Sequence, residues 1–210
     1  MAFVKEIKTE TGSIGIWEIS ENVEQLQKRF NYTTAEKEEF VKLKNEKRRK
    51  EYLAVRCLLN QMRGNKEELL YFESGKPHLK NRDISLSVSH SAELVTVFIS
   101  KKNAGIDTEN IFRNTQKVAP RFLSDSEIQT IAKSKSPDLS RIIYWSAKEA
   151  IFKCTFRKEI QFNSQIKIHP FQVENHGHFS GQLETGHKLD FFDLEYFFYG
   201  NNVVVYCVEG

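Results

Sequence analysis

Residues 144–153 read Tyr-Trp-Ser-Ala-Lys-Glu-Ala-Ile-Phe-Lys and belong to an apolar run without Gly or Pro that begins near residue 139. This run predicts a helix, and the spacing of four places Trp145, Glu149 and Lys153 on one face of it. An acid and a base spaced four apart are also typical of a solvated helix, where the pair stabilises by about 0.2–0.5 kcal/mol. Apolar residues surround most of this helix, however, which indicates that it is largely buried and that its charges need partners. The helix by itself fits a structural and a functional role equally well.

Two acidic residues lie about forty positions before this helix. Residues 103–109 read Asn-Ala-Gly-Ile-Asp-Thr-Glu and predict a strand, in which Asp107 and Glu109 point to the same side. Two carboxylates held on one side repel each other unless a cation lies between them. The pair is therefore either the solvent-facing end of an acidic strand or half of a site for a hard metal ion such as Mg²⁺, which prefers oxygen ligands.

A basic run precedes the acidic pair. Within residues 47–56, Arg48 and Arg56 are eight apart and lie two turns apart on roughly one face of a predicted helix. Two guanidinium groups aligned in this way could bind phosphate groups that lie between them. The alternative is a basic, solvated helix face. Because no nucleic-acid motif accompanies the run, we expect no nucleic-acid partner.

Two short motifs between the basic run and the acidic pair could contact a ligand. Gly75, Lys76 and Pro77 form a predicted turn, in which the backbone can approach a ligand closely. Ser89 and His90 lie at the end of a predicted strand, residues 84–89, whose polar face consists of serine. His90 could there donate hydrogen bonds to an anion. An ordinary turn and a surface histidine are the alternatives for the two motifs.

Composition limits the class of protein. The chain has 210 residues, of which 40% are hydrophobic and 28% charged, and this predicts a globular fold with one large core or two small ones. The net charge of +3 is uneven, because basic residues dominate residues 42–63, and this suggests an anionic partner. Three widely separated cysteines and the lack of a signal peptide predict buried thiols in a cytoplasmic protein. No apolar run approaches the ~20 residues of a membrane span, so no membrane partner is expected.

The order of the predicted elements gives the fold class. An opening hairpin over residues 1–20, a short helix over 21–30 and one long helix from Thr33 or Thr34 to Gly64 precede a strand at 69–73 and a hairpin over 84–99. After the strand at 103–109 come a helical segment at 118–122, a capped helix at 124–133, the central helix, and strands at 166–169, 179–183, 189–199 and 203–208. We therefore expect an α+β fold with two similar halves, residues 1–103 and 104–210, related by a pseudo-twofold axis.

The candidate residues together suit one class of substrate. They comprise three carboxylates, several cations and a serine–histidine pair, namely Asp107, Glu109, Glu149, Arg48, Arg56, Lys76, Lys148, Lys153, Ser89 and His90. This set fits a phosphoryl-type substrate, in which Mg²⁺ bridges phosphate oxygens and the cationic side chains take the remaining charge.

Five motifs in this order resemble those of the 4′-phosphopantetheinyl transferase superfamily, and the monomeric, surfactin-synthetase-activating type is the most similar. The signature pair is formed by residues 105–109 (Gly-Ile-Asp-Thr-Glu) and by residues 145–150 (Trp-Ser-Ala-Lys-Glu-Ala) followed by Lys153. Residues 48–56, 75–77 and 89–91 resemble further motifs of that type. The resemblance spans about residues 40 to 155.

The resemblance implies a Mg²⁺-dependent transferase that moves the 4′-phosphopantetheine arm of coenzyme A to a serine of an apo acyl or peptidyl carrier protein and releases adenosine 3′,5′-bisphosphate. It further implies a monomer with the coenzyme A cleft between the two halves. Carried over by position, the implied metal ligands are Asp107, Glu109 and Glu149. The implied coenzyme A contacts are Arg48, Arg56, Gly75, Lys76, Pro77, Ser89, His90, Lys148 and Lys153.

Several assignments stay open at this point. The general base for the carrier serine is either Glu149 or a metal-bound water, and the phosphate ligand in the basic helix is either Arg48 or Arg49. Thr108 stands where the family often has an aliphatic residue, and its side chain is expected to face away from the metal. A non-catalytic coenzyme A or nucleotide-binding regulatory module is the alternative function. Fatty acid, polyketide and siderophore carrier proteins are all candidate acceptors.

Overall fold

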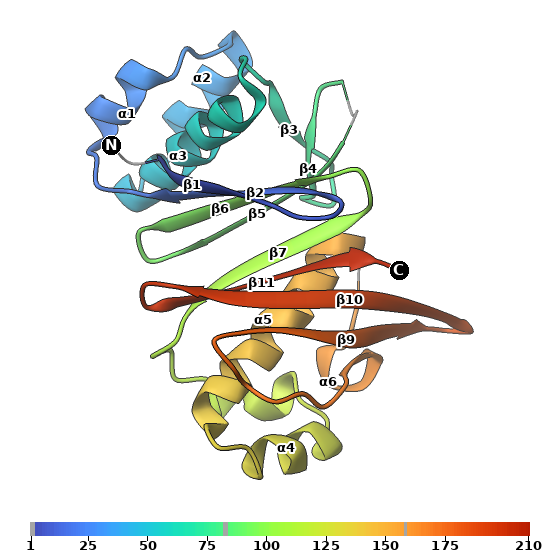
Figure 1. The fold of residues 1–210 in the computed structure, drawn as a ribbon. Coiled ribbons are helices and arrows are strands. Elements are labelled where there is room, and N and C mark those ends of the chain that lie inside the picture. Colours follow the sequence, from blue (N-terminus) through green and yellow to red (C-terminus); the bar gives the residue numbers. More distant parts are fainter. Residues whose placement is uncertain (1–2, 82–83, 158) are drawn as a thin grey trace.

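Two antiparallel sheets, each accompanied by one long helix, make up most of the chain (Figure 1). The structure is a computed structural model that describes residues 3–81, 84–157 and 159–210. Mixed helices and strands confirm the predicted α+β class. No helix within these ranges is long and apolar enough to cross a membrane.

The first sheet contains strands β1 (Phe3–Lys8), β2 (Gly12–Glu18), β5 (Ser85–Ser91) and β6 (Leu94–Ser100), in the order β1-β2-β6-β5. Helices α1 (Val23–Arg29), α2 (Thr34–Lys42) and α3 (Glu46–Arg63) cover one face of it (Figure 1). Strands β3 (Leu69–Tyr71) and β4 (Pro77–Leu79) form a separate two-stranded ribbon. The predicted hairpins are confirmed, except that residues 1 and 2 of the first lie outside the described residues.

The prediction of one helix from Thr33 to residue 63 is wrong, because the chain forms two helices there. Thr33 caps α2 with a capping box, as its residue type favours, but α2 ends at an extended Leu43. The side chain of Asn45 then accepts a hydrogen bond from the backbone of Arg48 and starts α3 afresh. Gly64, with φ of +70°, ends α3 in the left-handed conformation, as predicted.

The second sheet contains strands β7 (Ala104–Asn110), β8 (Ile166–Ile168), β9 (His176–Thr185), β10 (Lys188–Tyr199) and β11 (Asn202–Glu209). Their order is β7-β11-β10-β9-β8. A 3₁₀ helix at Gln116–Arg121, α4 (Asp125–Ala132), α5 (Pro137–Thr155) and α6 (Phe162–Gln165) cross from β7 to β8. The predicted central helix is α5, which begins two residues earlier than the sequence suggested, with Pro137 in its first turn.

Gly105 allows α5 to lie unusually close to β7. A Cβ atom at Gly105 would lie only 1.9 Å from the carbonyl oxygen of Ala150 and 2.7 Å from the backbone nitrogen of Cys154. Only glycine fits such a contact between a strand and a helix. Because Asp107 and Glu109 follow Gly105 on the same side of β7, this contact brings both carboxylates to the surface of α5.

A ladder of serine side chains joins the two sheets. Strands β5 and β7 belong to different sheets, yet the hydroxyl oxygens of Ser85, Ser87 and Ser89 accept hydrogen bonds from the backbone amides of residues 104, 106 and 108, at 3.2, 3.0 and 3.1 Å. Alternate residues of a strand point to the same side, so every second serine of β5 can meet every second amide of β7. The serine face of β5 is therefore directed at β7, which lies between the first sheet and the rest of the second (Figure 1).

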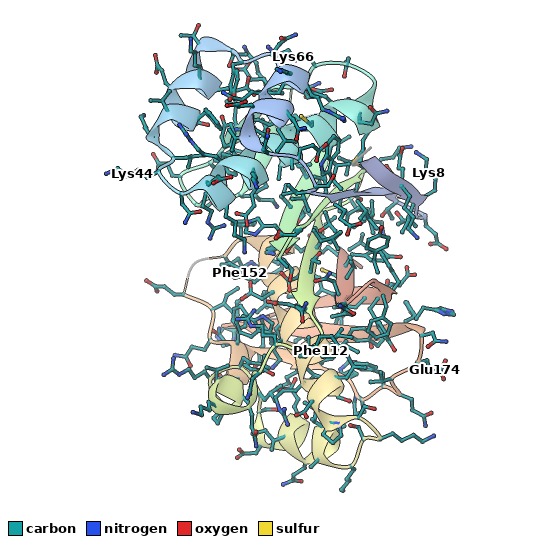
Figure 2. All side chains as sticks on the ribbon, turned by 90° about the vertical axis from the view of Figure 1, so that its left-hand side faces the viewer. Lys8, Lys44, Lys66, Phe112, Phe152 and Glu174 are labelled. Atoms are coloured by element: carbon teal, nitrogen blue, oxygen red, sulfur yellow. The ribbon has the colours of Figure 1, made fainter. Side chains whose placement is uncertain are left out.

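A shared apolar core reinforces this joint. Side chains of β2 and β6 in the first sheet, among them Ile16 and Phe98, pack in one cluster with Ile106 of β7 and Val204 of β11. Figure 2 shows the side chains that fill the region between the two sheets. The residues flanking the joint are thereby held in fixed positions relative to each other.

Candidate active site

Asp107 is the most strongly held acidic residue of the site. It is buried on β7, and its Oδ1 accepts hydrogen bonds from the Nζ of Lys153 at 2.7 Å and from the hydroxyl of Ser89 at 3.0 Å. Its Oδ2 accepts a hydrogen bond from the hydroxyl of Ser146 at 2.8 Å. Because Lys153 and Ser146 belong to α5, these contacts join the end of β7 to the helix that carries Glu149.

Glu109 lies one strand repeat further along β7. Its Oε1 accepts hydrogen bonds from the indole nitrogen of Trp145 at 2.7 Å and from the guanidinium of Arg113. Burial raises the pKa of Glu109, and the charge of Asp107 raises it further, while Arg113 and Trp145 lower it. The two carboxylates of the predicted acidic pair are therefore close enough to influence each other.

Glu149 faces the same region from α5. Burial raises the pKa of Glu149 to about 7, the charges of Asp107 and Glu109 act in the same direction, and Lys153 opposes them. No hydrogen bond or ion pair engages its carboxylate within the described part of the chain. Lys153 of α5 thus contacts Asp107 of β7, and Glu149 lies near enough to both carboxylates of β7 for their charges to raise its pKa.

A pocket of about 310 Å³ opens beside these residues, between α3, β5 and the end of α5. It is lined by Leu43, Arg48, Glu51, Tyr52, Val55, Arg56, Tyr71, Gly75, Pro77, Ser87, Val88, His90, Lys153 and Phe156. Lys153 belongs both to this pocket and to the carboxylate cluster, because its Nζ contacts Asp107. A ligand in the pocket would therefore reach the carboxylates through Lys153.

The two arginines of α3 both line the pocket, but they differ in exposure. Arg48 has 60% of its side chain exposed, and its Nη1 contacts Glu51 at 2.8 Å and His90 at 3.1 Å. Arg56 has only 1% exposed; its Nε lies 3.4 Å from the Glu36 carboxylate, and its guanidinium stacks over the ring of Tyr52. Arg49, the alternative to Arg48, stacks over the ring of Phe40 instead of lining the pocket.

The Gly75-Lys76-Pro77 turn reaches across to the second half of the chain. Gly75 has φ of +87°, which favours glycine, and Gly75 and Pro77 line the pocket. The Nζ of Lys76 donates a hydrogen bond to the carbonyl of Cys154 at 2.9 Å, near the end of α5. In this structure Lys76 holds the turn against α5 and is not among the residues that line the pocket.

The predicted role of Ser89 as a ligand contact needs correction. Its hydroxyl donates to Asp107 and accepts from the Nζ of Lys153 and from the amide of Thr108, at 3.0, 3.0 and 3.1 Å. A hydroxyl has one donor and two acceptor positions, so all of them are used. Ser89 is buried and positions Asp107 and Lys153. His90, its neighbour in β5, lines the pocket.

The predicted contact of Lys148 with coenzyme A is also wrong. Its side chain is fully buried on another side of α5, where the Nζ donates to Glu127 at 2.7 Å and to the carbonyls of Phe162 and Ile166 at 2.9 and 2.7 Å. Burial lowers the pKa of Lys148, while Glu127 raises it. All three donors of the ammonium are satisfied there, so Lys148 stabilises the second half of the chain instead of binding a ligand.

Residues 103–207 match the family model described as the 4′-phosphopantetheinyl transferase superfamily (ACPS), and this match covers half of the chain. The chain belongs to this superfamily. Membership supports the transfer of phosphopantetheine as its general activity, with a carrier protein as acceptor. A comparison with curated proteins gives no match. The matched residues contain β7 and α5, and hence every carboxylate of the cluster, whereas Arg48, Gly75 and His90 of the pocket precede them.

The carboxylate cluster of this transferase fits a hard cation by its chemistry. Asp107, Glu109 and Glu149 offer only oxygen ligands. Burial, and after it the charges of the neighbouring carboxylates, raise the pKa of Glu109 and of Glu149, and a divalent cation would relieve that repulsion. As the side chains lie, however, the described residues contain no group of three or more His, Cys, Asp or Glu that could hold a metal ion. Lys153 and Arg113 occupy the carboxylate oxygens of Asp107 and Glu109 instead.

Thr108, which departs from the usual family residue, faces away from this cluster as expected. Its hydroxyl lies 2.8 Å from that of Thr96 on β6, on the side of β7 opposite to α5. Two polar side chains therefore satisfy each other within the joint between the sheets. The carboxylates of Asp107 and Glu109 lie on the other side of β7 from this hydroxyl.

Sequence reasoning missed several residues that pair with the predicted candidates. These are Glu51 beneath Arg48, Ser146 beside Asp107, Arg113 beside Glu109, and Glu127 beside Lys148. One of them carries a signal in the sequence, because Glu51 is an acid three residues after Arg48 in a basic run. The others pair residues far apart or in a loop, which periodicity does not reveal.

Proposed function

We propose that this protein transfers the 4′-phosphopantetheine arm of coenzyme A to a serine of an apo acyl or peptidyl carrier protein, with Mg²⁺, and releases adenosine 3′,5′-bisphosphate. One observation carries the proposal: Asp107, Glu109 and Glu149 gather with Lys153 between β7 and α5, directly beside a pocket lined by cations. Membership of the superfamily supports the same reaction.

The pocket suits the nucleotide end of coenzyme A. Arg48 and Arg56 supply positive charge for the 3′-phosphate and the pyrophosphate, His90 lies beside Arg48, and the backbone of Gly75 and Pro77 offers a close wall for the adenine. Lys153 lies where the pocket meets the carboxylates. The pyrophosphate would therefore extend past Lys153 toward Asp107.

Asp107, Glu109 and Glu149 would hold the Mg²⁺ ion, which supplies charge neutralisation of the pyrophosphate when it is bound. The residues of the chain do the rest. Ser89 and Ser146 orient Asp107 through hydrogen bonds, and Trp145 orients Glu109 in the same way. Asp107 is buried between β7 and α5, whereas Glu109 and Glu149 are partly exposed and so stay accessible to a substrate.

The reaction itself exchanges one phosphorus–oxygen bond for another. The hydroxyl oxygen of the carrier serine attacks the phosphorus that bears the pantetheine arm, and the bond from that phosphorus to adenosine 3′,5′-bisphosphate breaks. The serine proton goes to Glu149, directly or through a water molecule, because the hydroxyl is a poor nucleophile while protonated. Lys153 stabilises the negative charge of the departing phosphate.

We also propose that the enzyme is of the monomeric, surfactin-synthetase-activating type, with its two α+β halves, residues 1–103 and 104–210, related by a pseudo-twofold axis. A single chain contributes α3 and β5 from one half and Lys153 from the other to the same pocket, so a partner chain is not needed to complete it. Three buried free thiols fit a cytoplasmic location. Light scattering of the purified protein tests the monomer.

The decisive experiment incubates the purified protein with Mg²⁺, coenzyme A and a panel of apo carrier proteins, and measures the intact mass of each carrier. We expect a gain of one phosphopantetheine arm on at least one carrier, and none on the same carrier with its acceptor serine changed to alanine. Binding of coenzyme A without a mass gain on any carrier, with or without Mg²⁺, would favour a non-catalytic regulatory module and reject the transferase.

A further inference from the structure

Glu51 is a buried acid at the floor of the pocket, with only 4% of its surface exposed. Its Oε2 accepts a hydrogen bond from the Nη1 of Arg48 at 2.8 Å, and its Oε1 lies 3.4 Å from the Nδ1 of His90. Arg48 and Glu51 belong to α3, whereas His90 belongs to β5. One carboxylate thus holds two pocket residues that come from different elements.

The contact between Arg48 and His90 determines where the proton of the imidazole lies. The Nη1 of Arg48 is 3.1 Å from the Nε2 of His90. A guanidinium can only donate hydrogen bonds, so Nε2 accepts here and carries no proton. The neutral imidazole then has its proton on Nδ1, which is the nitrogen that faces Glu51.

This arrangement conflicts with direct binding of an anion by His90. A phosphate oxygen accepts hydrogen bonds, and so does the Nε2 of His90 while it faces Arg48. For His90 to contact an anion in the pocket, Arg48 must leave Nε2 and Nε2 must take up a proton. Glu51 then lies beside the imidazolium that forms, at a distance that allows an ion pair.

We propose that Glu51 is a positioning residue that holds His90 in the tautomer with Nδ1 protonated, and that an anionic ligand group binds this pocket together with one proton, which goes from solvent to the Nε2 of His90. The identity of the ligand rests on the proposed function, which makes it the phosphate of coenzyme A or of adenosine 3′,5′-bisphosphate. The inference adds Glu51 to the residues that shape the phosphate site, and it adds the uptake of one proton to the binding step.

The charges around His90 support the direction of this coupling. Burial lowers the pKa of His90 in the free protein; Arg48 from α3 and Lys153 from α5 lower it further, and Glu51 alone among these charges raises it. A bound phosphate adds negative charge on the side of Nε2, which raises the pKa of His90. The affinity for the ligand should therefore fall as pH rises through the interval between these two pKa values.

A purely structural role for Glu51 predicts a different result. If Glu51 only neutralised Arg48 and Lys47, its loss would change the stability or the affinity by a similar factor at every pH. If it also faces the imidazolium, its loss lowers the pKa of His90 in the free and the bound protein, and the interval of proton uptake moves to lower pH. An opposite charge at this distance shifts a pKa by about 1 unit or more.

The test is calorimetric titration of the full chain with adenosine 3′,5′-bisphosphate, between pH 5.5 and 8.5, in pairs of buffers that differ in ionisation enthalpy. The difference between the two buffers reports the number of protons taken up. For the unmodified protein we expect an uptake that approaches one proton in addition to the titration of the ligand phosphates. For Glu51→Gln we expect the interval of uptake to lie about one pH unit lower.

Two further variants serve as controls. His90→Asn should bind with no uptake except that of the ligand, whose own titration is common to all proteins and cancels in the comparison. Glu67→Gln removes another buried acid of the same half, one that pairs with Arg63 on α3 and lies away from the pocket. It should show the same interval of uptake as the unmodified protein.

The unmodified protein offers a second measurement that does not depend on a variant. Nitrogen-15 chemical shifts of the imidazole should show a protonated Nδ1 and an unprotonated Nε2 for free His90, and two protonated nitrogens after saturation with the ligand. Uptake equal to that of His90→Asn, an unchanged interval in Glu51→Gln, or a free His90 with its proton on Nε2 would each overturn the inference while the transferase stands. No binding of the nucleotide at any pH would instead overturn the proposed function, and the inference with it.

Discussion

Two lysines of α5, five residues apart, differ in burial and in their partners. Five residues correspond to about 140° around a helix, so Lys148 and Lys153 leave α5 on different sides. Lys148 is fully buried and uses all three donors on Glu127 and two backbone carbonyls. Lys153 keeps 20% of its side chain exposed, contacts Asp107 and Ser89, and lines the pocket.

The difference shows that the role of a lysine in this helix depends on the groups around it and not on its residue type. Lys148 completes a closed network, in which no donor is left for a ligand. Lys153 has two acceptors for three donors and lies at the edge of a pocket, so it can bind a further acceptor. One side of α5 therefore stabilises the fold, and the other side serves the site.

The largest effect is expected at Glu149, on the side of α5 that faces β7. Glu149→Gln should lower turnover by about 10²–10⁴-fold, because the amide can neither take a proton from the serine nor carry a negative charge. The thermal midpoint should stay within a few degrees, since no hydrogen bond to the carboxylate is lost among the described residues. Single-turnover transfer and thermal denaturation measure the two quantities; full turnover in this variant would remove Glu149 from the mechanism.

On the side of α5 that carries Lys148, a substitution should lower stability and not act directly on the chemistry of transfer. Lys148→Met leaves the buried carboxylate of Glu127 without its cationic partner and should lower the free energy of unfolding by about 3–5 kcal/mol. Lys153→Met is the matched control on the same helix; because Lys153 is partly exposed, its loss should destabilise much less while it weakens transfer. Urea denaturation of both variants decides. Equal losses of stability would mean that the two sides do not differ as described.

Gly105 of β7 determines how closely α5 approaches that strand, and so affects both stability and the site. Gly105→Ala should lower the free energy of unfolding by about 1–3 kcal/mol, because the new methyl would meet the carbonyl oxygen of Ala150. Turnover should fall as well, since Asp107 and Glu109 of β7 would move away from Glu149 and Lys153 of α5. Gly181→Ala is the control, where the nearest atom is the flexible end of Ile168 at 3.0 Å. A smaller loss for Gly105→Ala than for Gly181→Ala would contradict the close contact.

The smallest effect concerns the thiols at the same contact. Burial raises the pKa of Cys207 well above its ordinary value, with the neighbouring Cys154 of α5 acting in the same direction. A thiol whose pKa is higher in the folded than in the unfolded chain holds its proton more tightly when folded, so stability should decline as pH rises above about 8.5. Ellman's reagent at pH 8 should leave both thiols unmodified in the folded protein and react with all three cysteines after denaturation. Rapid reaction of Cys154 or Cys207 in the folded protein would contradict their burial.

Local patterns predicted much of the fold. Alternating residues located the strands of both sheets, Gly64 marked the end of α3, and the capping box at Ser124 marked the start of α4. The break between α2 and α3 was missed, since a single capping side chain, Asn45, outweighed a continuous helical pattern. His90 was placed after its strand, but it lies within β5, because pairing with β6 extends that strand by two residues.

The carboxylates and Lys153 could be predicted for a physical reason. The period of two puts Asp107 and Glu109 on one side of β7, and the spacing of four puts Glu149 and Lys153 on one side of α5, and neither depends on the rest of the fold. Ser89 and Lys148 were assigned to the ligand wrongly, since their partners, Asp107 and Glu127, lie 18 and 21 residues away in the chain. No local pattern reports such a contact.

The amino-acid sequence by itself determined the α+β class, the approximate positions of most elements and the residue types that a phosphoryl-transfer site requires, because helix and strand periods and turn preferences act over a few residues. Only the tertiary structure decided which cations serve the pocket and which are enclosed by acids, and that a serine ladder joins β5 to β7. Those outcomes depend on burial and on hydrogen bonds between distant segments, and both exist only after the two sheets have packed together.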